Sequence, residues 1–314
     1  MKKLIEKKKL KPYHGILVLI LVLCDMMFLP FVLPRFLGFY GTIIVEGMFV
    51  VLSVAVVLLA RVDLREVFPV RMPKTGKVFG TLLLWVGTFL AAEIVVLCIS
   101  YFFPEKVFEA SQGISAGMES VPFMMAAFII AVTPAICEEA VFRGVFLNSL
   151  MGRWNKWIPI LITGIVFGMF HGSVVRFFPT AILGIVMGYI VVETGNIFYS
   201  MLFHFVNNLF PVLLTQLLEI SSQGIETEAE IMMMEIPLAS VGMYMCIGVA
   251  APFLIYIGNY LLHKGEEGHS DKLFPRQKRI SLILLSGISA VLFIFGGILC
   301  VIGMSYMMQY VQLY

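Results

Sequence analysis

Charged residues are scarce in this sequence. Only 13% of its 314 residues are charged, whereas 60% are hydrophobic and the mean hydropathy is +0.96. Soluble domains are closer to half apolar and about a quarter charged. The shortage of charge excludes an ordinary soluble domain and predicts an all-α, polytopic membrane protein, folded as a helical bundle in a lipid bilayer. The net charge of +2 says little by itself, and we expect no nucleic-acid partner.

A signal-peptide cleavage site is also missing. The basic start, MKKLIEKKKLKPYHG, leads into the apolar run ILVLILVLCDMMFLPFVLP, but no small-x-small motif follows that run. The run is longer than the hydrophobic region of a signal peptide. We therefore expect it to stay in the protein as a membrane anchor.

Paired cysteine motifs are absent as well. All five cysteines lie in apolar stretches, and none belongs to a CxxC motif or to a Cys/His cluster. This pattern favours small buried hydrophobic residues over disulfides or metal ligands.

Apolar stretches of membrane-spanning length occur along the whole chain. A spanning helix takes about 20 mostly apolar residues. We expect about nine such helices, of which the fifth to seventh are crowded together. They lie near residues 14–34, 38–60, 78–103, 121–151, 157–175, 177–193, 197–218, 236–263 and 280–308.

Lysine and arginine predict how these helices are oriented. With the N-terminus in the cytoplasm, 18 of the 22 basic residues fall on cytoplasmic segments. Only Arg35, Lys106 and Arg176 fall on outside segments, and Arg143 lies within a predicted helix. Cytoplasmic loops are enriched in lysine and arginine. The pattern therefore predicts a cytoplasmic N-terminus and an outside C-terminus.

Three acidic residues, Asp25, Glu46 and Glu93, stand within predicted membrane helices. An ionisable group inside a bilayer is costly and usually faces the protein interior or a water-filled cavity. Because each of these acids is alone on its helix, we expect structural roles for them.

A cluster of charge interrupts the fourth predicted helix at PAICEEAVFRG, residues 134–144. Glu139 and Arg143 are four residues apart, so their side chains are neighbours on a helix and can form an ion pair. Glu138 is turned by about 100° from Glu139 and lacks a local partner. It is either a spare structural acid or a functional carboxylate.

Two further polar pairs lie on later apolar helices. FGMFHG places Phe167 and His171 four residues apart, and MLFHFVNN gives His204 and Asn208 the same spacing. Each pair is therefore expected to share a helix face. At a rise of about 1.5 Å per residue, both histidines and Glu138 lie near the middle of the bilayer. A lone buried histidine is usually a packed core residue, but this convergence predicts a buried polar site.

This combination of side chains suits hydrolysis. A carboxylate and an imidazole that meet at one water can act as a general base. A second imidazole and a carboxamide can donate hydrogen bonds to the oxyanion of a tetrahedral intermediate. Thr133 and Ser149 lack the surroundings of a serine triad. Cys137, next to Glu138, is a less favoured alternative as a thiol nucleophile.

The three motifs together resemble a known family. EEAVFR, FGMFH and HFVNN, in this order on separate helices, are similar to the CPBP family. This family includes the CAAX prenyl endopeptidases and the bacterial Abi proteins linked to bacteriocin processing and immunity. The resemblance covers about residues 121–215. It implies a catalytic core over residues 121–218, preceded by three membrane helices in residues 1–120 and followed by two in residues 219–314.

By motif position, the resemblance implies an intramembrane endopeptidase of the glutamic type, without a cofactor. Glu138 would be the base that activates water, and His171 would assist it. His204 and Asn208 would form the oxyanion hole. Three further residues would shape and hold the site: Glu139, Arg143 and Phe167.

The expected substrate is a peptide or protein delivered through the membrane, such as a peptide precursor. The lysine-rich start of the chain is typical of bacterial proteins, in which prenylated substrates are not expected. We therefore expect a multi-pass protein of a bacterial plasma membrane.

Other functions stay open. His171, His204 and Glu138 could bind zinc in a metal-dependent membrane protease, although an HExxH motif is absent. A non-catalytic scaffold or immunity protein could keep the same polar residues as a binding pocket. A transporter could use Glu46 and Glu93 on an ion path, although paired half-helices and repeats are not evident.

Overall fold

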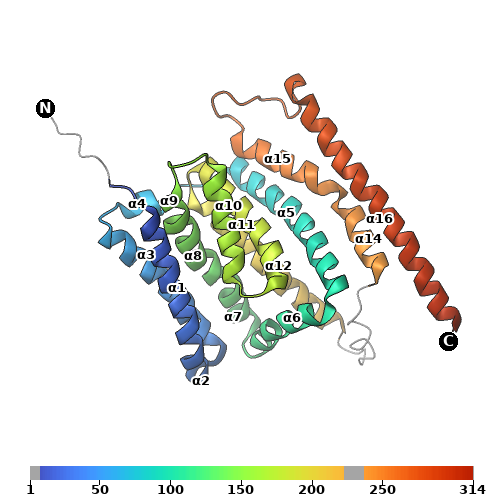
Figure 1. Ribbon diagram of the computed structural model, residues 1–314, viewed down its shortest axis with the longest axis horizontal. Coiled ribbons are helices and arrows are strands. Elements are labelled where there is room, and N and C mark those ends of the chain that lie inside the picture. The colour runs from blue at the N-terminus through green and yellow to red at the C-terminus, as the bar shows by residue number, and fades with distance from the viewer. Residues whose placement is uncertain (1–7, 223–236, 314) are drawn as a thin grey trace. The chain divides into compact units, whose positions relative to one another are not determined.

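The computed structural model describes residues 8–222 and 237–313, and the regular elements within them are helices (Figure 1). Eight described segments are long and apolar enough to cross a membrane. The expectation of an all-α, multi-pass membrane protein is therefore confirmed. The orientation of the termini stays a prediction, and part of the lysine-rich start that supports it, residues 1–7, lies outside the described residues.

The eight candidate spans correspond to eight of the nine predicted stretches. They are Pro12–Val32, Gly38–Leu59, Thr75–Phe102, Phe123–Leu150, Val174–Thr194, Ile197–Leu217, Leu238–His263 and Arg276–Tyr306. The remaining stretch contains α10 (Trp157–Phe170), an apolar helix of only 14 residues. Its length is about 21 Å, which is shorter than the roughly 30 Å of a bilayer's hydrocarbon core.

Helix α10 ends earlier than its hydropathy predicts. His171 lies in a turn directly after Phe170, and Gly172 adopts a φ of +64°. Glycine tolerates this left-handed conformation because it has no Cβ. The prediction that Phe167 and His171 share one helix face is therefore wrong, since His171 lies just beyond the helix end.

The chain divides into two compact units. The first comprises Met1–Pro73, Ile114–Phe170 and Gly184–Ser221, and the second comprises Lys74–Gly113, His171–Leu183 and Ser222–Tyr314. Each unit draws on three separate parts of the sequence. The sequence-based division at residues 120 and 218 follows the motifs instead, and it stays a prediction.

The first unit holds the elements that carry the EEAVFR and HFVNN motifs. Its described elements are α1 (Pro12–Val32), α2 (Pro34–Leu37), the 3₁₀ turn η1 (Gly38–Tyr40), α3 (Gly41–Leu59), α4 (Leu64–Val67), the end of α6 (Pro104–Glu119), α7 (Phe123–Ala127), the π-helical η2 (Phe128–Val132), α8 (Thr133–Glu139), the π-helical η3 (Ala140–Phe146), α9 (Leu147–Leu150), α10, the second half of α11 (Val174–Thr194) and α12 (Ile197–Ser222).

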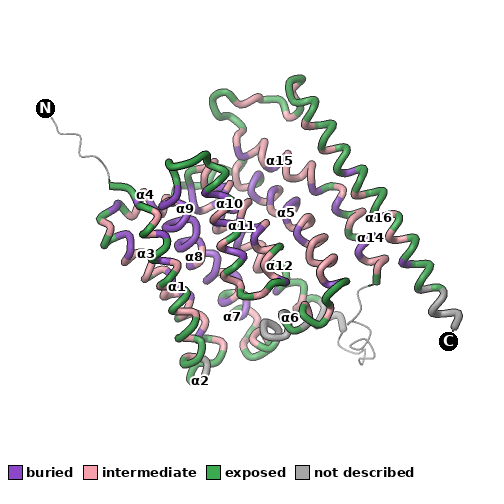
Figure 2. The backbone as a smooth tube through the Cα atoms, viewed as in Figure 1, coloured by how far each residue is buried: buried purple, intermediate pink, exposed green. Residues whose placement is uncertain are grey.

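Elements α7 to α9 follow one another without a break and form the most buried candidate span. In its most apolar stretch 56% of the residues are buried, against 11–39% in the other seven spans. Buried positions, shown in purple, accordingly concentrate on α8 and α9 in Figure 2. The π-helical η2 and η3 flank α8, and such wide turns occur frequently at functional sites. This span therefore forms the core of the first unit.

Small residues allow α10 and α11 to approach closely in the first unit. A Cβ added to Gly164 would lie 2.6 Å from the backbone nitrogen of Ile185. One added to Gly184 would lie 3.0 Å from Cα of Gly164. Close backbone contact of this kind is a usual way for helices to associate in membranes.

The second unit contains the remaining described helices. They are α5 (Thr75–Phe102), the start of α6, the first half of α11, α14 (Leu238–Ile247), the 3₁₀ turn η4 (Gly248–Ala250), α15 (Ala251–His263), the 3₁₀ turn η5 (Arg276–Lys278) and α16 (Arg279–Leu313).

Glycine contacts hold two helix pairs together in the second unit. Between α5 and α15, a Cβ on Gly258 would lie 2.7 Å from the carbonyl oxygen of Gly80. Between α14 and α16, a Cβ on Gly242 would lie 2.5 Å from the carbonyl oxygen of Gly296. Both pairs run side by side in Figure 1. The absence of side chains at these positions permits the backbones to touch.

Candidate active site

Glu139 and Arg143 form a fully buried ion pair within the first unit. Arg143 Nη1 lies 2.7 Å from Glu139 Oε1, and both side chains have no solvent exposure. Arg143 Nη2 also donates to the carbonyl oxygen of Gly184, at 3.0 Å. The predicted pairing is therefore confirmed. A buried pair is stable only when further hydrogen bonds satisfy its partners, and the Gly184 carbonyl supplies one of them.

His204, on α12, contacts the same carboxylate oxygen. Its Nδ1 lies 3.0 Å from Glu139 Oε1, and only 3% of the residue is exposed. A carboxylate paired with a guanidinium only accepts hydrogen bonds, so the histidine nitrogen must donate in this contact. The other ring nitrogen, Nε2, is then an acceptor in the neutral ring. The Glu139 carboxylate thus fixes both the orientation and the tautomer of His204.

Glu138 faces the free edge of this histidine. Its Oε2 lies 3.8 Å from His204 Nε2, which is too long for a direct hydrogen bond. That oxygen is buried and has no hydrogen-bond partner among the described residues. A water bonded to both atoms would fit this separation, since two hydrogen bonds of about 2.8 Å can span it. The carboxylate that the sequence left without a local partner therefore lies beside an imidazole.

Asn208 lies one helical turn after His204 and contacts the first π-helical segment. Its Nδ2 donates to the carbonyl oxygen of Ile130, at 3.0 Å. Ile130 lies in the π-helical η2, just before Pro134, which has no N–H group to donate. Asn208 therefore links α12 to this irregular part of the span. Its amide nitrogen has two hydrogens, so one remains for another acceptor.

Phe167 packs against two members of the cluster and against Phe142. Its ring centre lies 4.5 Å from the Arg143 guanidinium carbon, and the ring makes edge-on contacts with Phe142 at 5.0 Å and His204 at 5.7 Å. An arginine above an aromatic face gains a favourable cation–π interaction. Phe167 thus presents an apolar surface to Arg143 and His204, and its supporting role stays a prediction.

The structure brings together most of the predicted site residues within the first unit. Those in the cluster are Glu138, Glu139, Arg143, Phe167, His204 and, one turn away, Asn208. His171 belongs to the second unit, at the start of its middle segment. It directly follows Phe170, whose ring makes an edge-on contact with Phe142 at 5.3 Å. The role predicted for His171 stays a prediction.

Glu46 is a residue whose surroundings the sequence did not indicate. It lies on α3, only 9% of it is exposed, and its Oε2 has no partner among the described residues. It interacts electrostatically with Glu138 and with Asp25. Glu46 and Asp25 are each alone on their helices, but helix packing brings their charges within reach of one another and of Glu138. The rarity of acids inside membrane helices was the one available signal.

A metal ion would need several ligands at one place. Within residues 8–222 and 237–313, no group of three or more His, Cys, Asp and Glu side chains is arranged to hold one. Glu139 Oε2 has no hydrogen-bond partner in the described part of the chain, but its carboxylate is paired with Arg143. His204 Nε2 and Glu138 Oε2, which are 3.8 Å apart, are two further potential donors in the cluster. They could provide two ligands, and further ligands would have to come from elsewhere.

Residues 120–210 match the model of a protein family described as type II CAAX prenyl endopeptidase Rce1-like. The matched range includes all seven predicted site residues. The resemblance to the CAAX protease family is thus confirmed for this segment. The CAAX protease-like segment contains the whole α7–α9 span, α10, α11 and the first half of α12, and these elements hold the buried cluster described above.

A curated relative matches part of the chain. The candidate membrane peptidase YdiL of Bacillus subtilis (strain 168) is 24% identical over 106 residues, which are 34% of this chain and 43% of YdiL. The matched region therefore spans less than half of either protein. No solved structure matches the chain.

Proposed function

We propose that this protein is a membrane-embedded endopeptidase that hydrolyses a peptide bond with a water activated by Glu138. The observation that carries the proposal is the unbonded, buried oxygen of Glu138, 3.8 Å from a histidine nitrogen whose orientation Glu139 and Arg143 fix. The Rce1-like match and the likeness to a candidate membrane peptidase support the same class of activity.

The proposed reaction needs no side-chain nucleophile. A water bonded to Glu138 attacks the carbonyl carbon of the scissile peptide while the carboxylate takes one of its protons. The tetrahedral intermediate then collapses, the C–N bond breaks, and the same proton passes from Glu138 to the leaving amine. Proton transfer by a positioned group of this kind contributes about 10²–10⁴-fold to a rate.

The hydrogen bonds within the cluster determine which donors remain for the proposed oxyanion hole. Because Nδ1 of His204 donates to Glu139, its Nε2 can donate to an oxyanion only when the ring is protonated. Asn208 retains one amide hydrogen for the same purpose. Glu139 and Arg143 act by holding His204, so we assign them positioning roles. His171 is proposed to assist the water, as its motif position implies.

Two other functions make different predictions. A zinc-dependent protease would use Glu138, His171 and His204 as ligands, so its activity would depend on the metal. A non-catalytic scaffold would use the cluster as a binding pocket and would cleave nothing. For the substrate, we propose a membrane-delivered peptide or protein, because most of the cluster lies on two candidate membrane spans. The proposed location is a bacterial plasma membrane.

The test is cleavage of a library of membrane-delivered peptides by the purified full-length protein in detergent. Wild type is compared with Glu138→Gln, which keeps the size of the side chain and removes its basicity. We expect the variant to cleave about 10²–10⁴-fold more slowly. Glu193→Gln is the matched control, since Glu193 pairs with Lys156 at the surface of the same unit, and it should cleave at the wild-type rate.

Three outcomes discriminate among the proposals. Equal cleavage by wild type and Glu138→Gln would refute the glutamate mechanism. Loss of wild-type activity with a chelator, restored by added zinc, would favour the metalloprotease. A well-folded wild type that cleaves no peptide, together with specific binding of one peptide, would favour the scaffold.

A further inference from the structure

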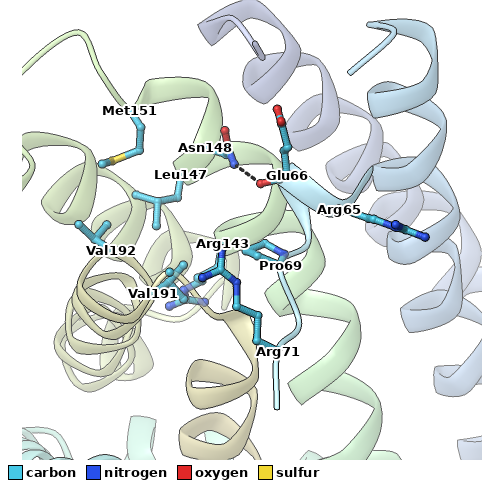
Figure 3. A pocket seen from close by; sticks show the side chains of 11 residues that line it. Arg65, Glu66, Pro69, Arg71, Arg143, Leu147, Asn148, Met151, Val191 and Val192 are labelled. Carbon is cyan, nitrogen blue, oxygen red and sulfur yellow. Dashed lines mark hydrogen bonds between the residues drawn. The ribbon is translucent and has the colours of Figure 1, made fainter. Parts of the chain in front are cut away.

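A cavity of about 390 Å³ lies within the first unit, at the end of the buried α7–α9 span (Figure 3). Three segments of chain meet there: the connection around α4, the α9 end of the span, and the C-terminal end of α11. Its lining residues are Arg65, Glu66, Pro69, Arg71, Arg143, Leu147, Asn148, Met151, Val191, Val192 and Gly195. Of these residues, only Arg143 has a role in the proposed reaction.

Positive charge dominates the polar side of the cavity. In Figure 3 the Arg71 side chain extends toward Arg143, whereas Arg65 and the Glu66 carboxylate point away from both. Arg71 has no ion-pair partner among the residues that the structure describes. Arg143 is buried, and its Nε has no hydrogen-bond partner there either. Two guanidinium groups thus face one space with unused donors, and an anion between them would relieve their repulsion.

The backbone beside the cavity is firmly held. Asn196 accepts a hydrogen bond from the Arg71 amide at 3.2 Å and donates to the Arg71 carbonyl at 3.0 Å. The Ile197 amide donates to the carbonyl of Pro69, at 2.9 Å. Asn148 donates to the carbonyl of Glu66, at 3.2 Å. These contacts position Arg71 without involving its side chain, so the guanidinium is free to bind a ligand.

The opposite side of the cavity is apolar. Leu147, Met151, Val191 and Val192 supply hydrocarbon surface next to the arginines. A ligand that matches both sides has an anionic group attached to an alkyl chain. The positive-inside pattern predicts that all three converging segments lie at the cytoplasmic face. Anionic lipids of the cytoplasmic leaflet attract basic residues there, and basic pockets between membrane helices bind their headgroups.

We propose that this cavity binds the phosphate headgroup of an anionic phospholipid, with Arg71 and Arg143 on the phosphate and the apolar wall along the start of an acyl chain. Arg143 joins this site to the buried cluster, because the same guanidinium pairs with Glu139. Binding of the lipid does not rest on the proposed proteolysis. A bound lipid would also hold Arg143, and through it Glu139 and His204, more firmly in place. Only this effect on catalysis rests on the proposed proteolysis.

The experiment measures lipid retention by native mass spectrometry of the full-length protein in detergent. The lipids offered are phosphatidylglycerol, which is anionic, and phosphatidylcholine, which is not. We expect wild type to retain phosphatidylglycerol in preference. Arg71→Gln should bind it about fivefold more weakly, since one basic residue near an anionic surface contributes about 1 kcal/mol. Arg71→Lys should restore most of the binding, because it restores the charge.

Arg153→Gln is the matched control. Arg153 is an exposed basic residue on the same predicted face, outside the lining of the cavity, so this variant should retain the lipid as wild type does. Equal retention by wild type and Arg71→Gln, or no preference between the two lipids, would overturn the proposal. If glycerol 3-phosphate, which has no acyl chain, displaced the bound lipid as effectively as added phosphatidylglycerol does, the role assigned to the apolar wall would be overturned. Since the readout is binding, failure of the protease proposal would leave these results unaffected.

Discussion

The two units hold their helices together by different means. In the first, a buried ion pair and side-chain hydrogen bonds link α8, η3, α11 and α12. In the second, α5 packs on α15 and α14 on α16 through glycines whose backbones nearly touch. Lipid tails are as apolar as leucine, so membrane helices associate through close packing and polar contacts instead of the hydrophobic effect. The first unit uses both contributions, since Gly164 and Gly184 also bring α10 and α11 into close contact, whereas the two helix pairs of the second unit rely on glycine packing.

This difference between the two units indicates which of them holds the buried polar site. Buried charges are costly in a bilayer, and they persist where a polar site needs them. The first unit contains the most buried span and the only ion pair with both side chains fully buried among the described residues. The ion pair of the second unit, between Lys77 and Glu266, is partly exposed. Glycine packing, by contrast, requires no polar group at the helix contacts of the second unit.

Removal of Arg143 should have the largest effect on stability. Arg143→Met leaves the Glu139 carboxylate buried without its cation, and the loss of one partner of a buried pair costs about 3–5 kcal/mol. The free energy of unfolding would be measured by titration with a denaturing detergent in mixed micelles. Lys77→Met, which breaks the partly exposed pair of the second unit, should cost about 0–1 kcal/mol.

A double variant sharpens this prediction. Glu139→Gln combined with Arg143→Met removes both charges, so no unpaired charge remains in the interior. We expect it to be more stable than Arg143→Met alone, yet inactive, because His204 loses its charged partner. A double variant less stable than the single one would mean that the two residues do not act as a pair.

Crowding of a glycine contact should have the next largest effect on stability. Gly258→Ala places a Cβ 2.7 Å from the Gly80 carbonyl oxygen and 2.7 Å from the Leu84 nitrogen, and neither backbone atom can move without shifting α5. Overpacking of this kind costs about 1–3 kcal/mol. Gly76→Ala, in the open space at the start of α5, should instead be neutral or stabilising by up to about 1 kcal/mol. The midpoints of thermal unfolding of Gly258→Ala and Gly76→Ala would be measured in detergent. Equal midpoints would contradict glycine packing in this unit.

The smallest expected effect is on the pH dependence of stability, and it comes from His269 in the connection between α15 and η5. Partial burial, and then the charges of Lys278 and His263, lower the pKa of His269 below its ordinary value of 6.5, while Glu266 and Asp271 act in the opposite direction. The unfolded chain therefore binds this proton more readily, so the free energy of unfolding falls as the pH drops through the ordinary value. His269→Gln should flatten the slope of the thermal midpoint against pH slightly. An unchanged slope would contradict the prediction.

Features set by local spacing could be predicted from the sequence. The ion pair of Glu139 and Arg143 follows from their separation of four residues on a helix. The spans follow from long apolar runs, because a bilayer requires about 20 such residues. The separation of Glu138 from that pair also follows from helical rotation.

Features set by contacts between distant segments could not be predicted. Nothing in the spacing of Glu46 indicates that α3 packs against α8 and brings its charge near Glu138. The hydrogen bonds of Asn196 to Arg71 join residues 125 positions apart. The early end of α10 was missed because hydropathy reports burial in lipid and not the backbone conformation that Gly172 adopts.

The shortness of α10 has a consequence for the surrounding lipid. Its residues Ile158, Leu161, Ile165 and Met169 are all more than 40% exposed, and their spacing places them along one side of the helix. A lipid-facing helix of about 21 Å against a hydrocarbon layer of roughly 30 Å is a hydrophobic mismatch, which bilayers accommodate by thinning locally. A membrane dimpled beside α10 would shorten the path from the aqueous phase to the level of Glu138.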